Sequence, residues 1–479
     1  MRTLKPKIGI TLLAVTLGVT AGHAQTQPAG SSALAVQPVV TPLYVGNSGV
    51  TNGDSGTPAA NDRALAGAQD LSPEASDARR SYWQSFFNLT SVLDTNPLGV
   101  GNTVSLTPWG SFYGGADLHL SSHTSDLSVN YLGGGALSQY RSGDGPIQQL
   151  AVGEKLSWRH TVISLFDQFG YLPEAVSEFY VPMGADLSAN REASLQPAFL
   201  PNQSIVSTLG QELTNSFVGE LDVPLSQRSS LTLLGSYSVL RFFKSNLLDL
   251  NNTTVQAGFN HHVTRNNTLA LLYRLTAFRF TNVYQPMDGH VVQLAFGRQV
   301  TGRMSFQVAG GPELAFFRSV AGQTSSGAAP PIIVRSKQLY WTLDSSMTYD
   351  IGRTVLKLGY GHSLTDGAGF LTGAITDQGS AAIDTPFSRR LTAEFIGGYA
   401  RNQGLMQTTQ QPTNEIYRDW FAGVTINHAL SRRASIFLSY QVQRQATNFV
   451  CAGIACGSEF TRQLISVGLT GRLQARPIE

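Results

Sequence analysis

The 479-residue chain is poor in charge, in lysine, in cysteine and in long apolar runs. Only 13% of its residues are charged, against about 25% in an ordinary soluble protein, and six of its 33 basic residues are lysine. Two cysteines exclude a disulfide-rich scaffold and a zinc module built on cysteine ligands. Beyond the N-terminus, no uncharged apolar run reaches the length of a membrane-spanning helix.

Residues 1–24 have the pattern of a secretory signal peptide. Three basic residues precede an apolar stretch from Ile8 to about Ala21, and small residues at positions 22 and 24 predict cleavage after Ala24. An N-terminal membrane anchor is the alternative, but the apolar stretch is short for a helix that must cross about 30 Å of hydrocarbon. Cleavage leaves 30 basic and 31 acidic residues, a balance that argues against a nucleic-acid partner.

Residues 25–80 differ in composition from the rest. They are rich in Pro, Gly, Ser and Ala and hold one aromatic residue, Tyr44. Such a segment buries too little apolar surface to offset the entropy of ordering it. We therefore expect a flexible periplasmic linker over 25–80, followed by the folded body at 81–479.

The body alternates with a period of two residues. In the segment 269–278, Leu269, Leu271 and Tyr273 share one face, whereas Arg274 and Thr276 lie on the other, as expected for β-strands. Many such segments run for about 10–14 residues, while soluble strands average about 5–6. A tilted strand needs about 9–11 residues to cross a bilayer. The pattern thus predicts transmembrane strands.

The connections alternate between tight turns and long stretches, which predicts an up-and-down antiparallel β-barrel of the bacterial outer membrane, with the tight turns in the periplasm. An even number of strands places both ends of the barrel in the periplasm, and loss of one hairpin would give sixteen strands instead of eighteen. The predicted strands span 82–93, 107–120, 126–140, 147–158, 161–170, 213–226, 229–243, 252–264, 267–280, 288–300, 303–318, 336–349, 353–363, 378–388, 390–401, 415–430, 433–446 and 458–473.

Arginine recurs in the tight turns. A guanidinium group can donate two parallel hydrogen bonds to a phosphate, so these residues could contact lipid headgroups at the inner leaflet; the alternative is that arginine is an ordinary turn residue here. The candidate lipid contacts are Arg228, Arg265, Arg303, Arg353, Arg389, Arg390, Arg432 and Arg433.

Aromatic residues near the strand ends predict the girdles that mark the two membrane interfaces. Packing between strand ends is the alternative. The residues are Trp158, Phe242, Phe243, Phe278, Phe280, Phe316, Phe317, Tyr360, Tyr399 and Trp420.

Charged residues of both signs fall on the polar face of the strands. They predict a water-filled lumen with little charge preference, open to neutral solutes such as sugars; a salt-bridge network that fills the lumen is the alternative. The candidate lumen-facing residues are Asp117, Lys155, Glu220, Asp222, Arg274, Asp344, Lys357 and Glu394.

The longest connection, 171–213, exceeds the usual length of a structureless loop. We expect it to constrict the lumen or to cap its outer mouth, with Glu174, Glu178, Asp186 and Arg191 as its polar contacts.

The chain holds no recognisable catalytic or metal-binding motif, so we expect no enzyme, no metal and no cofactor. His261 and His262 are adjacent and would point to opposite faces of a strand. Cys451 and Cys456, in the last long loop, predict a disulfide in the oxidising envelope, with two free thiols as the alternative.

The opening of the body, 86–98 (FFNLTSVLDTNPL) followed by the hairpin series 111–140, resembles barrel porins encoded with exopolysaccharide genes. In that resemblance Asp94 and Asn96 form a turn, and Tyr131 and Tyr140 are strand tyrosines. The ending LTGRLQARPIE departs from the terminal aromatic residue common in the class.

The resemblance implies a passive porin or export channel for small polar or saccharide solutes, with outer-membrane lipid and the outer-membrane assembly machinery as partners. The alternatives are a structural or adhesion barrel with a plugged lumen, and a hydrolase embedded in the barrel wall.

Overall fold

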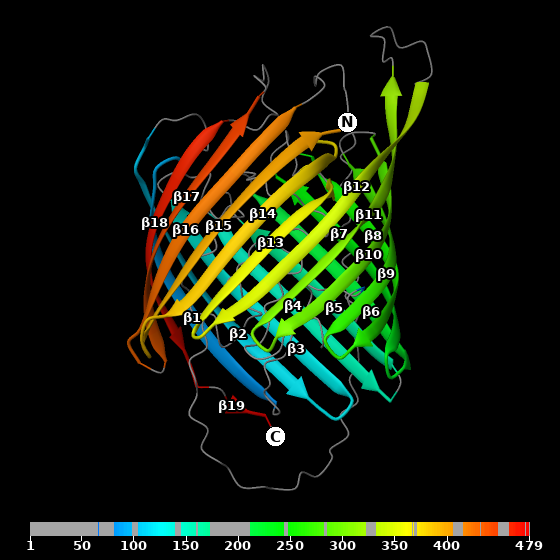
Figure 1. Cartoon of the computed structure of the whole chain (residues 1–479). Coiled ribbons are helices and arrows are strands. Elements are labelled where there is room, and N and C mark those ends of the chain that lie inside the picture. Colours follow the sequence, from blue (N-terminus) through cyan, green and yellow to red (C-terminus); the bar gives the residue numbers. More distant parts are fainter. Residues whose placement is uncertain are drawn as a thin grey trace, which may run out of the picture. The chain divides into compact units, whose positions relative to one another are not determined.

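The computed structural model describes residues 66, 81–97, 104–138, 145–159, 161–172, 211–243, 248–281, 285–321, 332–365, 367, 371–405, 415–431, 433–448, 459–474 and 476–478. Within this part, eighteen antiparallel strands form a closed wall (Figure 1), and the two-residue β19 (Arg476–Pro477) pairs with the start of β1. No helix among these residues is long and apolar enough to cross a membrane.

The eighteen predicted strands are confirmed, and their ends differ from the predicted ends by at most four residues. The strands are β1 (Tyr82–Asp94), β2 (Thr107–Ser121), β3 (Ser125–Ser138), β4 (Gly145–Trp158), β5 (Thr161–Leu172), β6 (Glu212–Ser226), β7 (Ser229–Phe242), β8 (Leu250–Thr264), β9 (Asn267–Phe280), β10 (Met287–Thr301), β11 (Met304–Ala321), β12 (Ile332–Ile351), β13 (Thr354–Thr365), β14 (Ala374–Pro386), β15 (Leu391–Gly404), β16 (Ile416–Ala429), β17 (Ala434–Thr447) and β18 (Phe460–Arg472).

Each strand pairs with the strands before and after it in the chain, and β1 closes the wall by pairing with β18. At this seam Leu93 lies opposite Ile465, and the Asn88 side chain donates a hydrogen bond to Thr470 Oγ1 at 3.0 Å. The sheet is therefore a closed up-and-down barrel, in which strand pairing satisfies backbone groups that lipid could not.

Five of the described tight turns share a local hydrogen bond. A Ser or Thr hydroxyl accepts the backbone N–H of the residue two positions later, a geometry that favours chain reversal. In four turns that later residue is an arginine: Ser226 accepts from Arg228, Thr301 from Arg303, Ser388 from Arg390 and Ser431 from Arg433.

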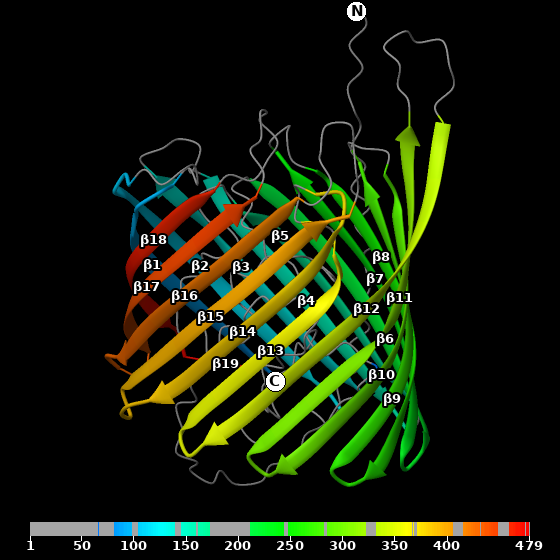
Figure 2. The same ribbon diagram turned by 45° about the horizontal axis from the view of Figure 1, so that its top comes forward.

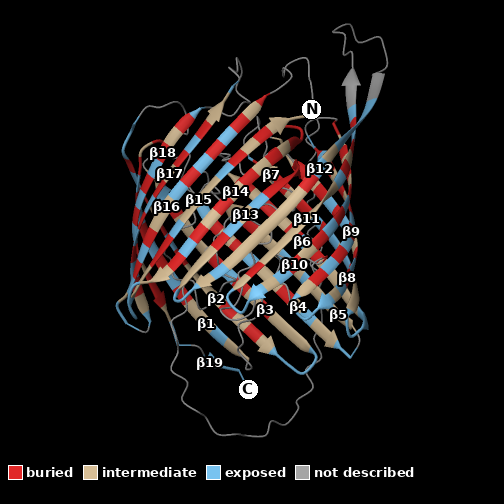
Figure 3. Cartoon of the chain, in the orientation of Figure 1, coloured by how far each residue is buried: buried red, intermediate tan, exposed pale blue. Residues whose placement is uncertain are grey.

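The burial pattern is inverted relative to a soluble protein. Along each strand buried and exposed residues alternate (Figure 3), but many of the buried residues are polar and the exposed ones are apolar. On β10, Gln293 is 2% exposed, whereas its neighbour Leu294 is 61% exposed. Only a surrounding solvent of hydrocarbon makes such an outer surface stable.

The strand lengths agree with a bilayer. A strand of 14 residues, such as β9, extends about 46 Å at about 3.3 Å per residue. A tilt of about 45° reduces this to a height of about 33 Å, close to the hydrocarbon thickness of about 30 Å. The fold is an eighteen-stranded transmembrane β-barrel of the kind found in bacterial outer membranes.

The aromatic prediction is partly wrong. Six of the ten residues lie in or beside the wall with exposed or half-exposed rings: Trp158, Phe243, Phe316, Tyr360, Tyr399 and Trp420. The other four, Phe242, Phe278, Phe280 and Phe317, are buried inside the barrel in one apolar cluster with Met287 and Leu364. For Phe242 and Phe317 the period of two explains the difference, because of two adjacent aromatic residues only one can face the lipid; Phe278 and Phe280 share the inward-facing register of β9.

Candidate functional site

The lumen is the place where polar and charged side chains converge. The eight residues predicted to face it all occupy the inward-facing register of their strands. Asp117, Arg274, Lys357 and Glu394 are buried there. Glu220, Asp222 and Asp344 are half-buried, and Lys155 is exposed near the turn end of β4. Their roles in a solute path stay predictions.

The described lumen wall carries charges of both signs, with more acids than bases. Sequence reasoning found five of its acids but missed the others, which share the inward-facing register. The thirteen inward-facing acids are Asp94, Asp117, Asp126, Glu212, Glu220, Asp222, Glu313, Asp344, Asp350, Asp384, Glu394, Glu415 and Asp419. The five inward-facing bases are Lys155, Arg274, Lys357, Arg462 and Arg472.

At mid-height of the barrel, one arginine lies among two acids. Arg274 is close enough to Glu313 and Asp344 for electrostatic attraction to both. The Gln293 amide donates hydrogen bonds to Thr342 Oγ1 at 2.6 Å and to Asp344 Oδ2 at 3.1 Å. Because a single cation serves both carboxylates, this part of the wall keeps an excess of acid.

A second acidic pair lies nearer the tight turns. Asp384 on β14 is directly opposite Glu394 on β15, and both side chains are buried. Lys357 on β13 attracts Asp384. Two like charges facing each other across strands are destabilising unless a cation lies between them; Lys357 supplies one positive charge for two carboxylates.

At the opposite end, a buried ion pair closes the seam between β1 and β18. Arg462 donates to Asp94 Oδ2 through Nε at 2.9 Å and through Nη2 at 2.5 Å, and both side chains are essentially unexposed. The second oxygen of Asp94 accepts the backbone N–H of Asn96 at 2.9 Å. Asp94 therefore forms the turn with Asn96 that the resemblance implied and also anchors the barrel closure.

The wall splits where β12 leaves β13. Their pairing ends at Leu343 and His362, although β12 continues to Ile332, and β11 and β12 rise beyond the neighbouring strands (Figure 2). Glu313, from β11, reaches across this gap and accepts the Leu364 backbone N–H at 3.3 Å. The acid thus replaces a strand partner that β13 has lost.

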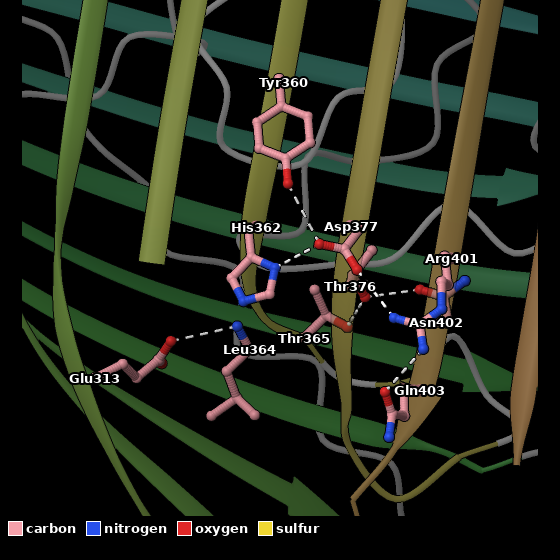
Figure 4. A network of polar contacts seen from close by, with 10 residues as sticks. All are labelled: Glu313, Tyr360, His362, Leu364, Thr365, Thr376, Asp377, Arg401, Asn402 and Gln403. Carbon is pink, nitrogen blue, oxygen red and sulfur yellow. Dashed lines mark hydrogen bonds and ion pairs between the residues drawn. The ribbon is translucent and has the colours of Figure 1, made fainter. Parts of the chain in front are cut away.

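A polar network surrounds the split (Figure 4). On the outward face, Asp377 accepts hydrogen bonds from Tyr360 at 3.3 Å and from Arg401 at 3.2 Å, and lies 2.5 Å from His362 Nδ1. Trp341 stacks on the His362 ring with a centroid distance of 3.8 Å. This stacking holds β12 against β13 at the last point where the two strands pair.

On the inward face of the same strands, three side chains form a chain of hydrogen bonds. Thr365 and Thr376 share one at 2.7 Å, and Thr376 donates to Asn402 Oδ1 at 2.7 Å. All three side chains are buried. They tie β13, β14 and β15 together beside the split.

Ala66 lies inside the barrel. Its backbone N–H donates to Asn260 Oδ1 at 2.9 Å, and its carbonyl accepts from Gln256 Nε2 at 2.6 Å. Gly258 lies between these two side chains on β8, and a Cβ there would come within 2.1 Å of Ala66 Cβ. Ala66 also packs on an apolar group formed by Ala270, Leu272 and Ala295.

Sequence reasoning gave no signal for this contact. Apart from Ala66, the predicted linker 25–80 lies outside the described residues, and so does the predicted signal peptide at 1–24. The four loop residues Glu174, Glu178, Asp186 and Arg191, the cysteines Cys451 and Cys456, and Arg432 also lie outside them. The other seven turn arginines are exposed in or beside tight turns.

The adjacent histidines point to opposite faces. His261 Nδ1 lies 2.9 Å from Ser229 Oγ on the outward face near a tight turn, while His262 Nδ1 lies 2.9 Å from Thr268 Oγ1 on the inward face. For Ser229 to act as a nucleophile, His261 would have to serve as a base oriented by a third group. Among the described residues, no acidic side chain is hydrogen-bonded to His261. The described residues also hold no group of three or more His, Cys, Asp or Glu side chains that could bind a metal ion.

Comparisons with known proteins give only distant similarity. No family model matches the chain, and no curated protein matches it. Solved structures similar to it include Pseudomonas aeruginosa OccK2 (OpdF) in complex with glucuronate, at 11% identity and a TM-score of 0.42, covering 82% of this chain and 98% of that one.

Two further structures are similar at the same level. Pseudomonas aeruginosa OccK11 (OpdR) has 14% identity and a TM-score of 0.38, covering 83% of this chain and 96% of that one. Acinetobacter baumannii OccAB3 has 10% identity and a TM-score of 0.38, covering 82% and 99%. Similarities this low assign the chain to no family, and its function has to be inferred from the barrel's own geometry.

Proposed function

We propose that this protein is a pore of the bacterial outer membrane that passes small polar solutes and prefers cations. The observation that carries the proposal is the inverted wall, in which buried polar side chains line the interior and exposed apolar side chains face outward along the strands. A barrel of 16–18 strands is wide enough to leave an aqueous lumen. It is this lumen through which solutes would pass.

The charge of the wall supports the cation preference. Thirteen inward-facing acids stand against five inward-facing bases in the described part of the chain. Rings of carboxylates favour cations in channels, and a lumen with low-dielectric walls concentrates the field of its charges. This proposal replaces the expectation of little charge preference, because the inward register collects more acids than the sequence pattern had indicated.

Planar-bilayer recording of the purified chain tests the pore directly. We expect a conductance and, under a KCl gradient, a reversal potential whose sign corresponds to cation preference. Neutralising Asp384, Glu394 and Asp419 together, as Asp384→Asn, Glu394→Gln and Asp419→Asn, should lower the K⁺/Cl⁻ permeability ratio, because ten inward-facing acids then remain against five bases. Asp167→Asn is the matched control, because that carboxylate lies on the outward face of β5 and should leave the ratio unchanged.

Anion preference in the unmodified protein would contradict the acidic-lumen argument. An equal shift in the Asp167→Asn control would mean that surface charge, and not the lumen, sets the selectivity.

Ala66 favours the second candidate function, a barrel whose lumen is plugged. The two hydrogen bonds to its backbone hold one position of the N-terminal segment against the inner wall. Replacing both partners, as Gln256→Ala and Asn260→Ala, removes these bonds, each worth about 1 kcal/mol. We expect a larger single-channel conductance or more frequent opening than in the unmodified protein.

The control for that experiment is Ser236→Ala with Ser238→Ala, two inward-facing residues of the neighbouring β7. If both double variants change conductance equally, the Ala66 contact is not what limits flow. If no variant conducts at all, the protein is a structural barrel and the pore proposal fails.

Finer features of the function follow from the same proposal. A saccharide solute would meet a lumen lined with amide groups such as those of Gln293, Asn427, Gln441 and Gln443. The turn arginines are proposed to contact inner-leaflet phosphates, and the assembly machinery is the partner that inserts the barrel. Two complementation experiments separate export of a polymer from uptake of small solutes. Restored secretion in cells that lack their own export channel would indicate export, whereas restored growth in cells that lack their own porin would indicate uptake.

A further inference from the structure

Basic side chains gather on the outward face of β11 and β12, just beyond the exposed aromatic residues nearest the long connections. On β11, Arg318 follows Phe316 by two residues. On β12, Lys337 and Arg335 precede Trp341 by four and six residues. Even spacings keep all of them on the lipid-facing side, and each of these side chains is exposed.

The register brings like charges directly together. Arg318 lies opposite Arg335, and Lys337 lies opposite Phe316. The same arrangement recurs on β15 and β16, where Arg401 lies opposite Arg418, immediately beyond the paired rings of Tyr399 and Trp420. Cross-strand pairs of like charge are destabilising when nothing lies between them. Arg401 has Asp377 as its partner at 3.2 Å, so it is the pair of Arg318 and Arg335 that indicates a surface that binds an anion.

The acids nearby do not balance this charge. Asp288 on β10 lies 2.5 Å from Arg279 Nη2 and 3.6 Å from Arg318 Nη2. In the described part of the chain, neither Arg335 nor Lys337 has an acidic side chain within ion-pair distance. Four cations thus share one carboxylate. We call these four residues, Arg279, Arg318, Arg335 and Lys337, the outer basic patch.

We propose that the outer basic patch binds the phosphate groups of a phosphorylated glycolipid in the outer leaflet of the membrane. This inference rests on the proposed membrane location. Each arginine guanidinium can donate two parallel hydrogen bonds to a phosphate. The exposed aromatic rings beside the patch mark the interface where the lipid headgroups begin.

The position of the patch selects a lipid over a dissolved anion or a protein. The patch continues the apolar surface of the same two strands, where Leu314 and Leu339 face outward, the latter 72% exposed. It lies on the outside of the wall, so a solute that crosses the lumen does not reach it. A ligand that fits this surface must place acyl chains against Leu314 and Leu339 and, at the same time, phosphate groups against the outer basic patch.

Native mass spectrometry of the full chain in neutral detergent, titrated with diphosphoryl lipid A, tests the proposal. We expect the unmodified protein to retain the lipid, and the triple variant Arg318→Gln, Arg335→Gln, Lys337→Gln to bind it at least about tenfold more weakly, because several charge-assisted hydrogen bonds are lost. The matched control is Arg241→Gln, Arg298→Gln, Arg444→Gln, which removes the same charge from outward positions of β7, β10 and β17 outside the patch and should keep the affinity.

Equal lipid retention by the triple variant and the unmodified protein overturns the proposal, and so does an equal loss in the control. A third arm adds millimolar inorganic phosphate; full displacement of the lipid by phosphate alone would identify a free-anion site and overturn the lipid assignment. A gel shift between boiled and unboiled samples is measured in parallel. A barrel that shows this shift without binding lipid contradicts only this inference, whereas a chain without the shift contradicts the membrane barrel itself.

Discussion

Replacing Arg462 by Met should destabilise the barrel by about 3–5 kcal/mol, because it leaves the Asp94 carboxylate buried without its cation. Both side chains of this pair are essentially unexposed, and Arg462 holds Asp94 with two hydrogen bonds. The pair lies at the seam where the first strand meets the last, so its loss weakens the closure of the whole wall. The measurement is urea unfolding in detergent, followed by the mobility of unboiled samples.

An ion pair one strand away provides the control. Arg444 Nη2 lies 3.4 Å from Glu459 Oε1, but both side chains are about half exposed. Such an exposed pair contributes about 0–1 kcal/mol, so Arg444→Met should change the unfolding midpoint little. The double variant Asp94→Leu, Arg462→Met should recover most of the lost stability, because it removes the uncompensated charge. Equal effects of Arg462→Met and Arg444→Met would contradict the seam argument.

The strand pattern was predictable because hydrocarbon demands a strict period of two. In the middle of β9 and β10 the outward-facing positions are apolar, as at Leu271 and Leu294, whereas the inward-facing positions tolerate Gln293 or Arg274. The tight turns were equally clear, since arginine recurs in them between the alternating segments. The predicted strand ends deviate most at β12 and β14, each of which begins four residues before its predicted start.

The charge balance of the lumen was not predictable in the same way. Whether Glu415 or Asp94 faces inward depends on where a strand begins, and one residue of error reverses the face. The contact of Ala66 with Gln256 joins positions 190 residues apart, and no local pattern in a Gly- and Pro-rich segment signals it. The arginine pairs on the outer wall depend on the register between strands, which the sequence of a single strand does not contain.

A charge placed in the middle of the outer face should reveal whether lipid surrounds the barrel. Leu294 lies at the centre of β10 and faces outward, 61% exposed. In a bilayer, Leu294→Arg should cost about 2–4 kcal/mol, because an arginine at the midplane loses its hydration. Val300, on the same strand and the same face but beside a tight turn, is 40% exposed, and Val300→Arg should cost only about 0–1 kcal/mol near the interface.

Equilibrium unfolding of both variants from phosphatidylcholine vesicles gives the comparison. If water covered the outer face, both arginines would be surface substitutions, each within about 0.5 kcal/mol of the unmodified protein. A difference of 2 kcal/mol or so between two positions on one strand therefore measures the depth dependence that only hydrocarbon imposes. Equal costs at Leu294 and Val300 would mean that the exposed leucines face another solvent or another protein, and the inverted wall would no longer argue for a membrane pore.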